Sequence, residues 1–291
     1  MARISIYILM ALALVYAGLR WGIAPTQKSH AYFEGRGFEV IAHGAGQGLQ
    51  PKNTLEAALM ANRVGADIIE IDIHATRDGV LVLSHDDTVD DMTNGSGLIR
   101  EMDFAQLQAL DAAHGFLREK NSPLAGQGIR IPALSAVFDA LPDAHYIIEI
   151  KQPEPPIHTA LCQLVRERGL QNQVLVGSFF TEPLEAFRSA CPEVATSMSQ
   201  GEVTRLVLLE KIGLSHLYDL PGVALQLPMT SGSITIVTDS FLSAMQARGV
   251  KVHIWTINSL DDMRELMAMG VDGIITDYPD RLIRLRDNLT E

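Results

Sequence analysis

Carboxylates and imidazoles interrupt two apolar runs in the stretch EIDIHATRDGVLVLSHDD, where a buried strand would normally carry Val or Ile. Alternate side chains of a strand face the same side, so Glu70 and Asp72 would share one face and the isoleucines around them the other. Two like charges in a confined place are costly unless a cation or a proton neutralises them. The pair therefore predicts a bound divalent metal.

A second apolar segment, YIIEIK at 146–151, adds Glu149 and Lys151 on one face by the same reasoning. Three carboxylates from two strands, with room for water and substrate oxygens, would suit Mg²⁺ or Ca²⁺. Because this set needs neither His nor Cys, it favours these ions over Zn²⁺.

Two further strand-like runs end in histidine, at His43 and His85. Two imidazoles beside a hard metal and Lys151 suit in-line phosphoryl chemistry, with one histidine as base, the other as acid on the leaving oxygen, and the lysine neutralising charge on the phosphate. A single histidine at a strand end is more often an ordinary polar residue. The convergence of five or more titratable groups on strand ends favours a catalytic site.

The elements that must position these residues alternate between short β-branched runs and helical patterns from Phe38 onward, with glycines ending most helices. Such alternation indicates parallel pairing, and eight or nine strands over about 250 residues favour a TIM (β/α)8 barrel, an α/β fold with its active site at the carboxyl ends of the strands. Nine runs are strand candidates: 38–43, 68–73, 80–85, 146–151, 174–179, 194–199, 223–228, 251–258 and 273–278.

Two segments break this rhythm. Residues 87–132 are polar and rich in glycine and predict a small insertion after the third strand candidate. Residues 200–222 predict a longer apolar helix beside the mouth of the barrel.

The N-terminus carries a largely apolar run of sixteen uncharged residues, Ile4 to Leu19, followed by Arg20 and Trp21. We expect residues 1–24 to form a transmembrane anchor or an uncleaved signal that tethers the protein to a membrane, on a side that the arginines do not decide. A cleaved signal peptide and a buried amphipathic helix are the alternatives. Residues 25–37 would then be a linker, and 38–291 the catalytic domain.

Charge and cysteine content limit the remaining possibilities. Beyond residue 36 the chain has 19 basic against 34 acidic residues, a net charge of −15, which makes nucleic acid an unsuitable partner. Cys162 and Cys191 lack metal-ligand spacing and are expected to be ordinary core or helix residues.

The segments IAHGAGQGLQPKNTLEA, GADIIEIDIHATRDGVLVLSHDDTVDDMTNGSG, IPAL, YIIEIK, VHIWTIN and GVDGIITDYP resemble the glycerophosphodiester phosphodiesterase family over 38–285. That resemblance implies a TIM barrel that uses a divalent metal to hydrolyse glycerophosphodiesters to an alcohol and glycerol phosphate. It implies that His43 and His85 are the acid-base pair, and that Lys151 and Trp255 contact the phosphate and the substrate. Glu70, Asp72 and Glu149 would be the metal ligands.

The chain departs from the family pattern at two positions. The family usually has Arg where Gly44 stands and Glu where Lys52 stands. We therefore expect Lys52 to replace part of the missing guanidinium near the phosphate, as a point charge.

The substrate and the function class have alternatives. The apolar segment LVLLEKIGLSHLYDLPGVALQLP is similar to the lysophospholipase D-like branch of the family, so a lysophospholipid cleaved to lysophosphatidic acid is as reasonable a substrate as a soluble glycerophosphodiester. SHDD could also belong to an HD-type metal phosphohydrolase, but that fold is helical. A decayed, membrane-tethered binding protein would not be expected to retain both histidines, the three carboxylates and Lys151.

Overall fold

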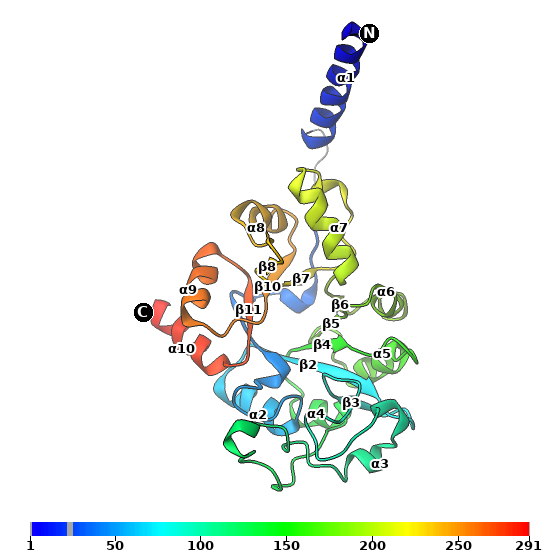
Figure 1. The fold of residues 1–291 in the computed structure, drawn as a ribbon, viewed down its shortest axis with the longest axis vertical. Coiled ribbons are helices and arrows are strands. Elements are labelled where there is room, and N and C mark those ends of the chain that lie inside the picture. Colours follow the sequence, from blue (N-terminus) through cyan, green and yellow to red (C-terminus); the bar gives the residue numbers. More distant parts are fainter. Residues whose placement is uncertain (1, 22–25, 291) are drawn as a thin grey trace.

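Eight parallel strands form a nearly closed barrel in the computed structural model, which describes residues 2–21 and 26–290 (Figure 1). Their order around the barrel is β6, β5, β4, β2, β1, β11, β10, β7. The predicted (β/α)8 architecture is confirmed in this form. The barrel strands are β1 (Glu39–Ala42), β2 (Ile68–Ala75), β4 (Tyr146–Ile150), β5 (Val174–Gly177), β6 (Ala195–Thr196), β7 (Ala224–Leu227), β10 (Lys251–Ile254) and β11 (Gly273–Thr276).

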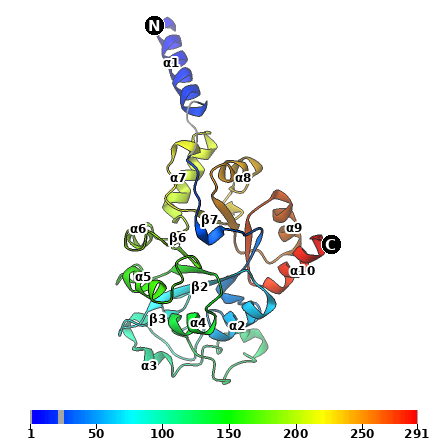
Figure 2. The same cartoon turned by 180° about the vertical axis from the view of Figure 1, so that it is seen from behind.

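Helices surround the barrel, as the views from both sides show (Figures 1 and 2). Thr54 and Ser259 cap two of them, each with its side chain accepting a hydrogen bond from a backbone amide three residues on. The outer helices are α2 (Leu55–Val64), α4 (Leu134–Ala140), α5 (His158–Glu167), α6 (Thr181–Ala190), α7 (Gln200–Lys211), α8 (Asp239–Gln246), α9 (Leu260–Met269) and α10 (Pro279–Thr290).

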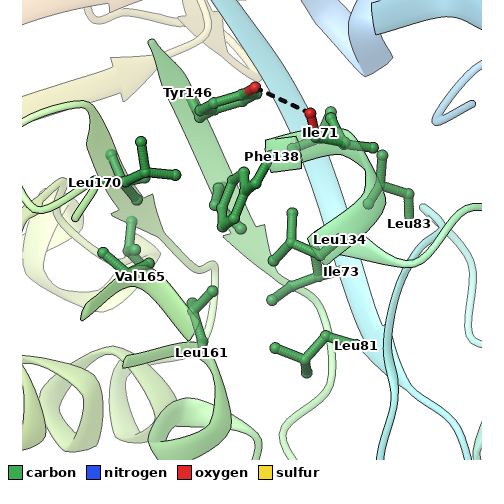
Figure 3. Packing of buried hydrophobic residues seen from close by; sticks show 14 of the residues in the cluster. Ile71, Ile73, Leu81, Leu83, Leu134, Phe138, Tyr146, Leu161, Val165 and Leu170 are labelled. Atoms are coloured by element: carbon green, nitrogen blue, oxygen red, sulfur yellow. Dashed lines mark hydrogen bonds between the residues drawn. The ribbon is translucent and has the colours of Figure 1, made fainter. Parts of the chain in front are cut away.

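The alternation along β2 divides the strand between two environments, as predicted. Ile71 and Ile73 are fully buried in the outer layer, where they pack with Phe138 of α4 (Figure 3). Ile68 points the other way, into a cluster inside the barrel with Ile41, Ile147 and Leu175. Glu70 and Asp72 therefore emerge on the inner side at the carboxyl end of the strand.

The third strand candidate is not a barrel strand. β3 (Leu81–Leu83) runs antiparallel to the outer end of β2, pairing Ile73 with Leu83 and Ala75 with Leu81. A parallel return would need a crossover of a dozen or more residues, whereas only a short turn separates these two runs. β2 thus extends beyond the barrel and β3 returns toward it.

The predicted insertion follows β3 and has a small apolar cluster of its own. Val89, Ile99 and Leu107 are buried there together with Val82 of β3. Its regular elements are short, η3 (Ile99–Glu101), α3 (Phe104–Leu107) and η4 (Arg118–Lys120).

The segment predicted to be a linker closes the amino-terminal end of the barrel. A 3-10 turn, η1 (Ala31–Phe33), places Tyr32 in the interior cluster with 1% of its surface exposed. The Tyr32 hydroxyl donates to the carbonyl of Tyr146 at the start of β4 (3.2 Å). The segment therefore contributes to the core.

The N-terminal run forms helix α1 (Ala2–Trp21), which extends away from the barrel beyond α7 (Figure 1). No helix in the described part of the chain is long and apolar enough to cross a membrane, so the transmembrane anchor predicted for residues 1–24 is not supported. The run between Arg3 and Arg20 spans about 24 Å as a helix, against about 30 Å of bilayer hydrocarbon. Residues 1 and 22–24 of that prediction lie outside the described residues.

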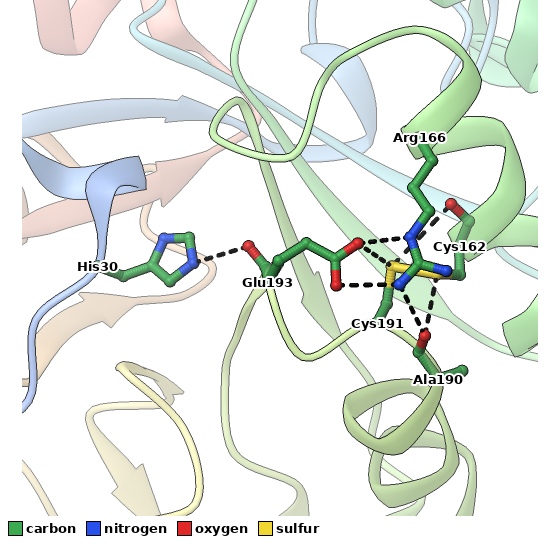
Figure 4. Close-up of a disulfide and its surroundings, with 6 residues drawn as sticks. All are labelled: His30, Cys162, Arg166, Ala190, Cys191 and Glu193. Carbon is green, nitrogen blue, oxygen red and sulfur yellow. Dashed lines mark hydrogen bonds and ion pairs between the residues drawn. A yellow bond between two sulfur atoms is a disulfide. The ribbon is translucent and has the colours of Figure 1, made fainter.

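Cys162 and Cys191 form a disulfide, which corrects the expectation of ordinary core cysteines (Figure 4). Cys162 lies on α5 and Cys191 follows α6, and the two Cα atoms are 5.7 Å apart because these neighbouring helices pack together. Arg166 supports the junction by pairing with Glu193 (2.5 Å).

The remaining small elements lie in the loops that connect strands and helices. The strands β8 (Thr230–Ser231) and β9 (Ile234–Thr235) form an exposed hairpin after β7, and η5 (Ser215–Leu217) follows α7. The helix predicted within 200–222 is α7, and its first turns line the mouth. A further 3-10 turn, η2 (His43–Ala45), leads out of β1.

Candidate active site

Three carboxylates meet at the carboxyl ends of β2 and β4, as the sequence predicts. Glu70, Asp72 and Glu149 each offer an oxygen within 4.8 Å of the other two. The register of the sheet causes this, because Asp72 is directly paired with Glu149. Glu70 and Asp72 are 6% and 2% exposed, so water screens their mutual repulsion poorly.

The electrostatics of this cluster fit a hard divalent cation. Burial, reinforced by the charge of Asp72, raises the pKa of Glu70 to about 8. The same two causes raise the pKa of Glu149. Neighbouring carboxylates that repel one another ionise more easily when a cation lies between them. Mg²⁺ and Ca²⁺ both prefer a set of oxygen ligands such as this one.

Lys151 supplies one positive charge to this cluster. Its ammonium lies 2.9 Å from Glu149 and 3.2 Å from Asp72. Burial disfavours the charged amine, yet the two carboxylates outweigh burial and raise the pKa of Lys151. The lysine therefore stays cationic at the mouth of the barrel, where a phosphate could reach it.

His43 is held by a carboxylate that our sequence reasoning missed. Its Nδ1 donates to Asp277, which follows β11, over 2.7 Å. The other oxygen of Asp277 accepts from the amide of Asn258 (2.7 Å). Burial opposes the imidazolium, but the bond to Asp277 and the charge of Glu70 raise the pKa of His43 to about 9. Because Nδ1 is used as a donor, Nε2 is the nitrogen left for proton transfer.

His85 has a similar partner in the next residue along the chain. Its Nδ1 donates to Asp86 over 2.8 Å, which again leaves Nε2 for chemistry. The backbone that carries His85 is fixed to the barrel, since the amide of Ser84 donates to the carbonyl of Asp72 (3.0 Å). The antiparallel return of β3 is what places this histidine beside the carboxylates.

Two cavities meet at this set of residues and share His85, Glu149, Lys151 and Phe179. The first, which we call the apolar lobe, has a volume of about 370 Å³ and extends from His43 and Glu70 toward α7 and the β8–β9 hairpin. The second, which we call the polar lobe, has a volume of about 790 Å³ and lies toward the insertion and the loop after β4. The linings of both lobes are mixed, and the names refer to the residues that distinguish them. The apolar lobe is lined by Met198, Val203, Leu227, Pro228, Ile236 and Trp255 together with polar side chains such as Ser197, Gln200 and Gln226. The polar lobe is lined by His74, Asp87, Arg100, Gln152 and Glu154 together with Pro153, Pro155 and Phe180.

The two remaining predicted site residues lie in different places. Trp255 is on the wall of the apolar lobe, with its ring 5.8 Å from that of Phe179. Lys52 is absent from the described linings of both lobes. Its ammonium instead lies 3.0 Å from Asp91 and 3.6 Å from Asp86.

The loop after β1 braces the metal-ligand candidates in a way that our sequence reasoning missed. Asn53 is 3% exposed, donates to the carboxylate of Asp72 (2.8 Å) and accepts from its amide (3.0 Å). The amide of Gly44 donates to Glu70 (2.7 Å), and Gly44 has a φ of 52°, a left-handed conformation that favours glycine. Asp277 could have been found because it follows a strand, as Lys151 does.

Comparison with known proteins decides which family uses this geometry. Residues 43–281 match the sequence model of the Glycerophosphoryl diester phosphodiesterase family, and this range contains every residue of the site described above. The chain belongs to that family. It is therefore a phosphoric diester hydrolase, as its resemblance to the family implies.

Relatives of the phosphodiesterase align along almost their whole length. A glycerophosphodiester phosphodiesterase from Caldanaerobacter subterraneus is 30% identical over 251 residues, which cover 84% of this chain and 96% of the relative. Human lysophospholipase D is 23% identical, over 83% of this chain and 84% of the relative. Among solved structures, an Oleispira antarctica phosphodiesterase in complex with the product sn-glycerol-3-phosphate is 25% identical, with a TM-score of 0.70, and the match covers 89% of this chain and all of that one.

Proposed function

We propose that the protein hydrolyses glycerophosphodiesters to an alcohol and glycerol 3-phosphate, with His43 and His85 as the acid-base pair. The observation that carries the proposal is that both histidines line one cavity with Glu70, Glu149 and Lys151, and that each donates Nδ1 to a carboxylate of its own. A product complex of a relative, with sn-glycerol-3-phosphate, agrees with this choice.

His43 would act as the base. It accepts a proton at Nε2 from the attacking hydroxyl, whether that belongs to water or to the substrate, while Asp277 stabilises the imidazolium that forms. His85 would act as the acid. As the bond from phosphorus to the leaving oxygen breaks, the bonding pair goes to that oxygen and the Nε2 proton of His85 transfers to it. Lys151 would stabilise the charge that develops on the phosphate.

Glu70, Asp72 and Glu149 would hold a single divalent cation, Mg²⁺ or Ca²⁺. Such an ion, when bound, supplies Lewis-acid polarisation of the phosphoryl oxygens. Asn53 and the amide of Gly44 keep two of these carboxylates in fixed positions by hydrogen bonding to them.

The test is release of choline from glycerophosphocholine by the full chain, with Mg²⁺, with Ca²⁺ and with EDTA. Turnover that EDTA abolishes and either cation restores would support the proposal. Turnover that is indifferent to EDTA would refute the role of the carboxylates. Full activity of His43→Ala or His85→Ala would refute the role of that histidine.

A lysophospholipid is a second candidate substrate, favoured by the apolar lobe. One side of the site is lined by Met198, Val203 and Ile236, while Asp87 and Arg100 line the other side. A phosphodiester with an acyl chain on one arm and a polar head group on the other matches this division. A volume of about 370 Å³ is enough for part of such a chain.

The ratio of kcat/KM for lysophosphatidylcholine to that for glycerophosphocholine separates the two substrates. Val203→Glu places a charge in the apolar lobe and should lower this ratio if the lobe holds an acyl chain. Leu208→Glu is the matched control, on the same helix but 63% exposed. A ratio that neither variant changes would remove the lysophospholipid from consideration.

A further inference from the structure

Lys52 departs from the family pattern in residue type. It also contacts two carboxylates, although we expected it near the phosphate. Its side chain is only 20% exposed, and its ammonium lies between Asp91 (3.0 Å) and Asp86 (3.6 Å). Neither carboxylate is a candidate metal ligand, and both belong to the segment that follows His85. Lys52 therefore connects the loop after β1 to the start of the insertion.

Asp86 connects this lysine to the catalytic histidine. One of its oxygens accepts from Nδ1 of His85 (2.8 Å), and its other oxygen faces the ammonium of Lys52. Lys52 is thus one residue removed from an imidazole that our proposed mechanism uses as the acid. The insertion is attached to the same point from the other side, because Arg118 pairs with Asp91 (3.6 Å).

His85 needs external support because it is not enclosed by the barrel. Its side chain is 46% exposed, and that of Asp86 is 38% exposed. An exposed pair of this kind has little stability alone, since both side chains lose conformational freedom to form it, but a network of several charges holds geometry better. Lys52 adds a third, better buried member. Its backbone is fixed beside Asn53, which is hydrogen-bonded to Asp72.

Gly44 and Lys52, the two departures from the family pattern, lie against each other. A Cβ atom added to Gly44 would be 3.4 Å from the Cβ of Lys52. From this point the Lys52 side chain extends toward Asp86 and Asp91. It therefore does not line either lobe as described above.

We propose that Lys52 is a positioning residue for His85, which it orients through Asp86, and that it does not bind the phosphate. This proposal rests on the proposed function, in which His85 protonates the leaving oxygen. Loss of Lys52 should then slow reactions whose leaving group needs that proton and spare those whose leaving group departs without it.

The experiment compares two esters of glycerol 3-phosphate in the full chain loaded with Mg²⁺ or Ca²⁺. Glycerophosphocholine releases an alcohol that requires protonation, and the 4-nitrophenyl ester releases a phenolate that does not. Lys52→Met should lower kcat for glycerophosphocholine on the order of tenfold, with KM little changed, and should leave kcat for the nitrophenyl ester close to that of the wild type. Lys120→Met, which changes an exposed lysine of the insertion, is the matched control.

Two further variants keep the test valid if Lys52→Met folds poorly. Lys52→Arg retains the charge and the reach to both carboxylates and should retain most of the activity. Asp91→Asn weakens one anchor of Lys52, 3.0 Å away, and should produce a smaller loss with the same dependence on the leaving group. If Lys52 were a phosphate ligand, Asp91→Asn would release it and cause no loss.

Three results would overturn the proposal: a rise in KM for both esters, an equal loss of kcat for both, or no change in Lys52→Met. Failure of the wild type to hydrolyse either ester would instead refute the proposed function. The two hypotheses are therefore tested by different arms of one experiment.

Discussion

Replacing Asp277 by asparagine tests the assignment of His43 as the base. The substitution keeps the shape of the side chain but removes the negative charge 2.7 Å from Nδ1 of His43. When His43 takes a proton it becomes an imidazolium, and a hydrogen bond to a charged group contributes about 1.5–3 kcal/mol. Since each 1.36 kcal/mol in the barrier is a factor of ten in rate, kcat should fall roughly 10- to 150-fold.

The pKa of His43 also indicates that the substitution should weaken the base. Burial alone would lower it, and the bond to Asp277 is the largest of the influences that raise it to about 9. Asp277→Asn should therefore lower the pKa of His43 and make the imidazole a weaker base. The rising limb of the pH profile for kcat should move to lower pH while the plateau falls, because the neutral form needed for catalysis is reached earlier but accepts a proton less readily.

Steady-state hydrolysis of glycerophosphocholine measures this effect, and Asp272→Asn is the matched control. Asp272 immediately precedes β11, at the amino-terminal end of the barrel. Its carboxylate pairs with the ammonium of Lys251 (2.8 Å). We expect Asp272→Asn to leave kcat unchanged. A near-normal kcat in Asp277→Asn would show that His43 is not the base. An equal loss in both variants, with a lowered Tm, would show that the effect is one of folding.

The remaining predictions concern the metal, the disulfide and pH. Glu70→Gln should abolish the binding of Mg²⁺ or Ca²⁺ that calorimetry detects. Glu39→Gln, which changes a buried carboxylate at the other end of the barrel, should leave this binding intact. Binding by Glu70→Gln at wild-type affinity would remove Glu70 from the ligand set. Replacing Cys162 and Cys191 by alanine removes a disulfide between residues 29 positions apart. The free energy of unfolding, measured in urea, should fall by about 3.6 kcal/mol. An unchanged midpoint would show that the bond is not formed. Burial and a nearby arginine lower the pKa of His145 from 6.5 to about 4, so the folded protein binds fewer protons than the unfolded chain in that window, and its stability falls as pH decreases from 6.5 to 4. His145→Gln should flatten the dependence of Tm on pH there, and a slope equal to that of the wild type would contradict this account.

The alternation of residue types along one strand was enough to predict half of the site. Glu70 and Asp72 could be placed inside the barrel because the neighbouring isoleucines had to face the helices. Glu149 followed because parallel strands end at the same edge of a barrel. These inferences needed only the period of a strand, which is local, and the fold class, which the repeated alternation of strand and helix patterns indicates.

The features that could not be predicted depend on how distant segments meet. Whether 80–85 pairs parallel or antiparallel depends on the whole barrel, although the short turn before it was a usable sign. The Cys162–Cys191 bond depends on the packing of α5 against α6, which no spacing reveals. Lys52 has a flexible side chain whose direction is decided by Asp86 and Asp91, residues more than thirty positions away.

Because β3 returns antiparallel, the proposed acid lies where the barrel core meets the separate apolar cluster of the insertion. The barrel carries the carboxylates and His43, whereas His85 belongs to a segment with a separate apolar cluster around Val89 and Ile99. Segments of this kind open locally at a smaller free-energy cost than the global unfolding of a barrel. Such an opening would displace His85, the proposed acid, while the barrel stayed folded. The upper temperature for turnover would then be set by the insertion, below the melting temperature of the molecule.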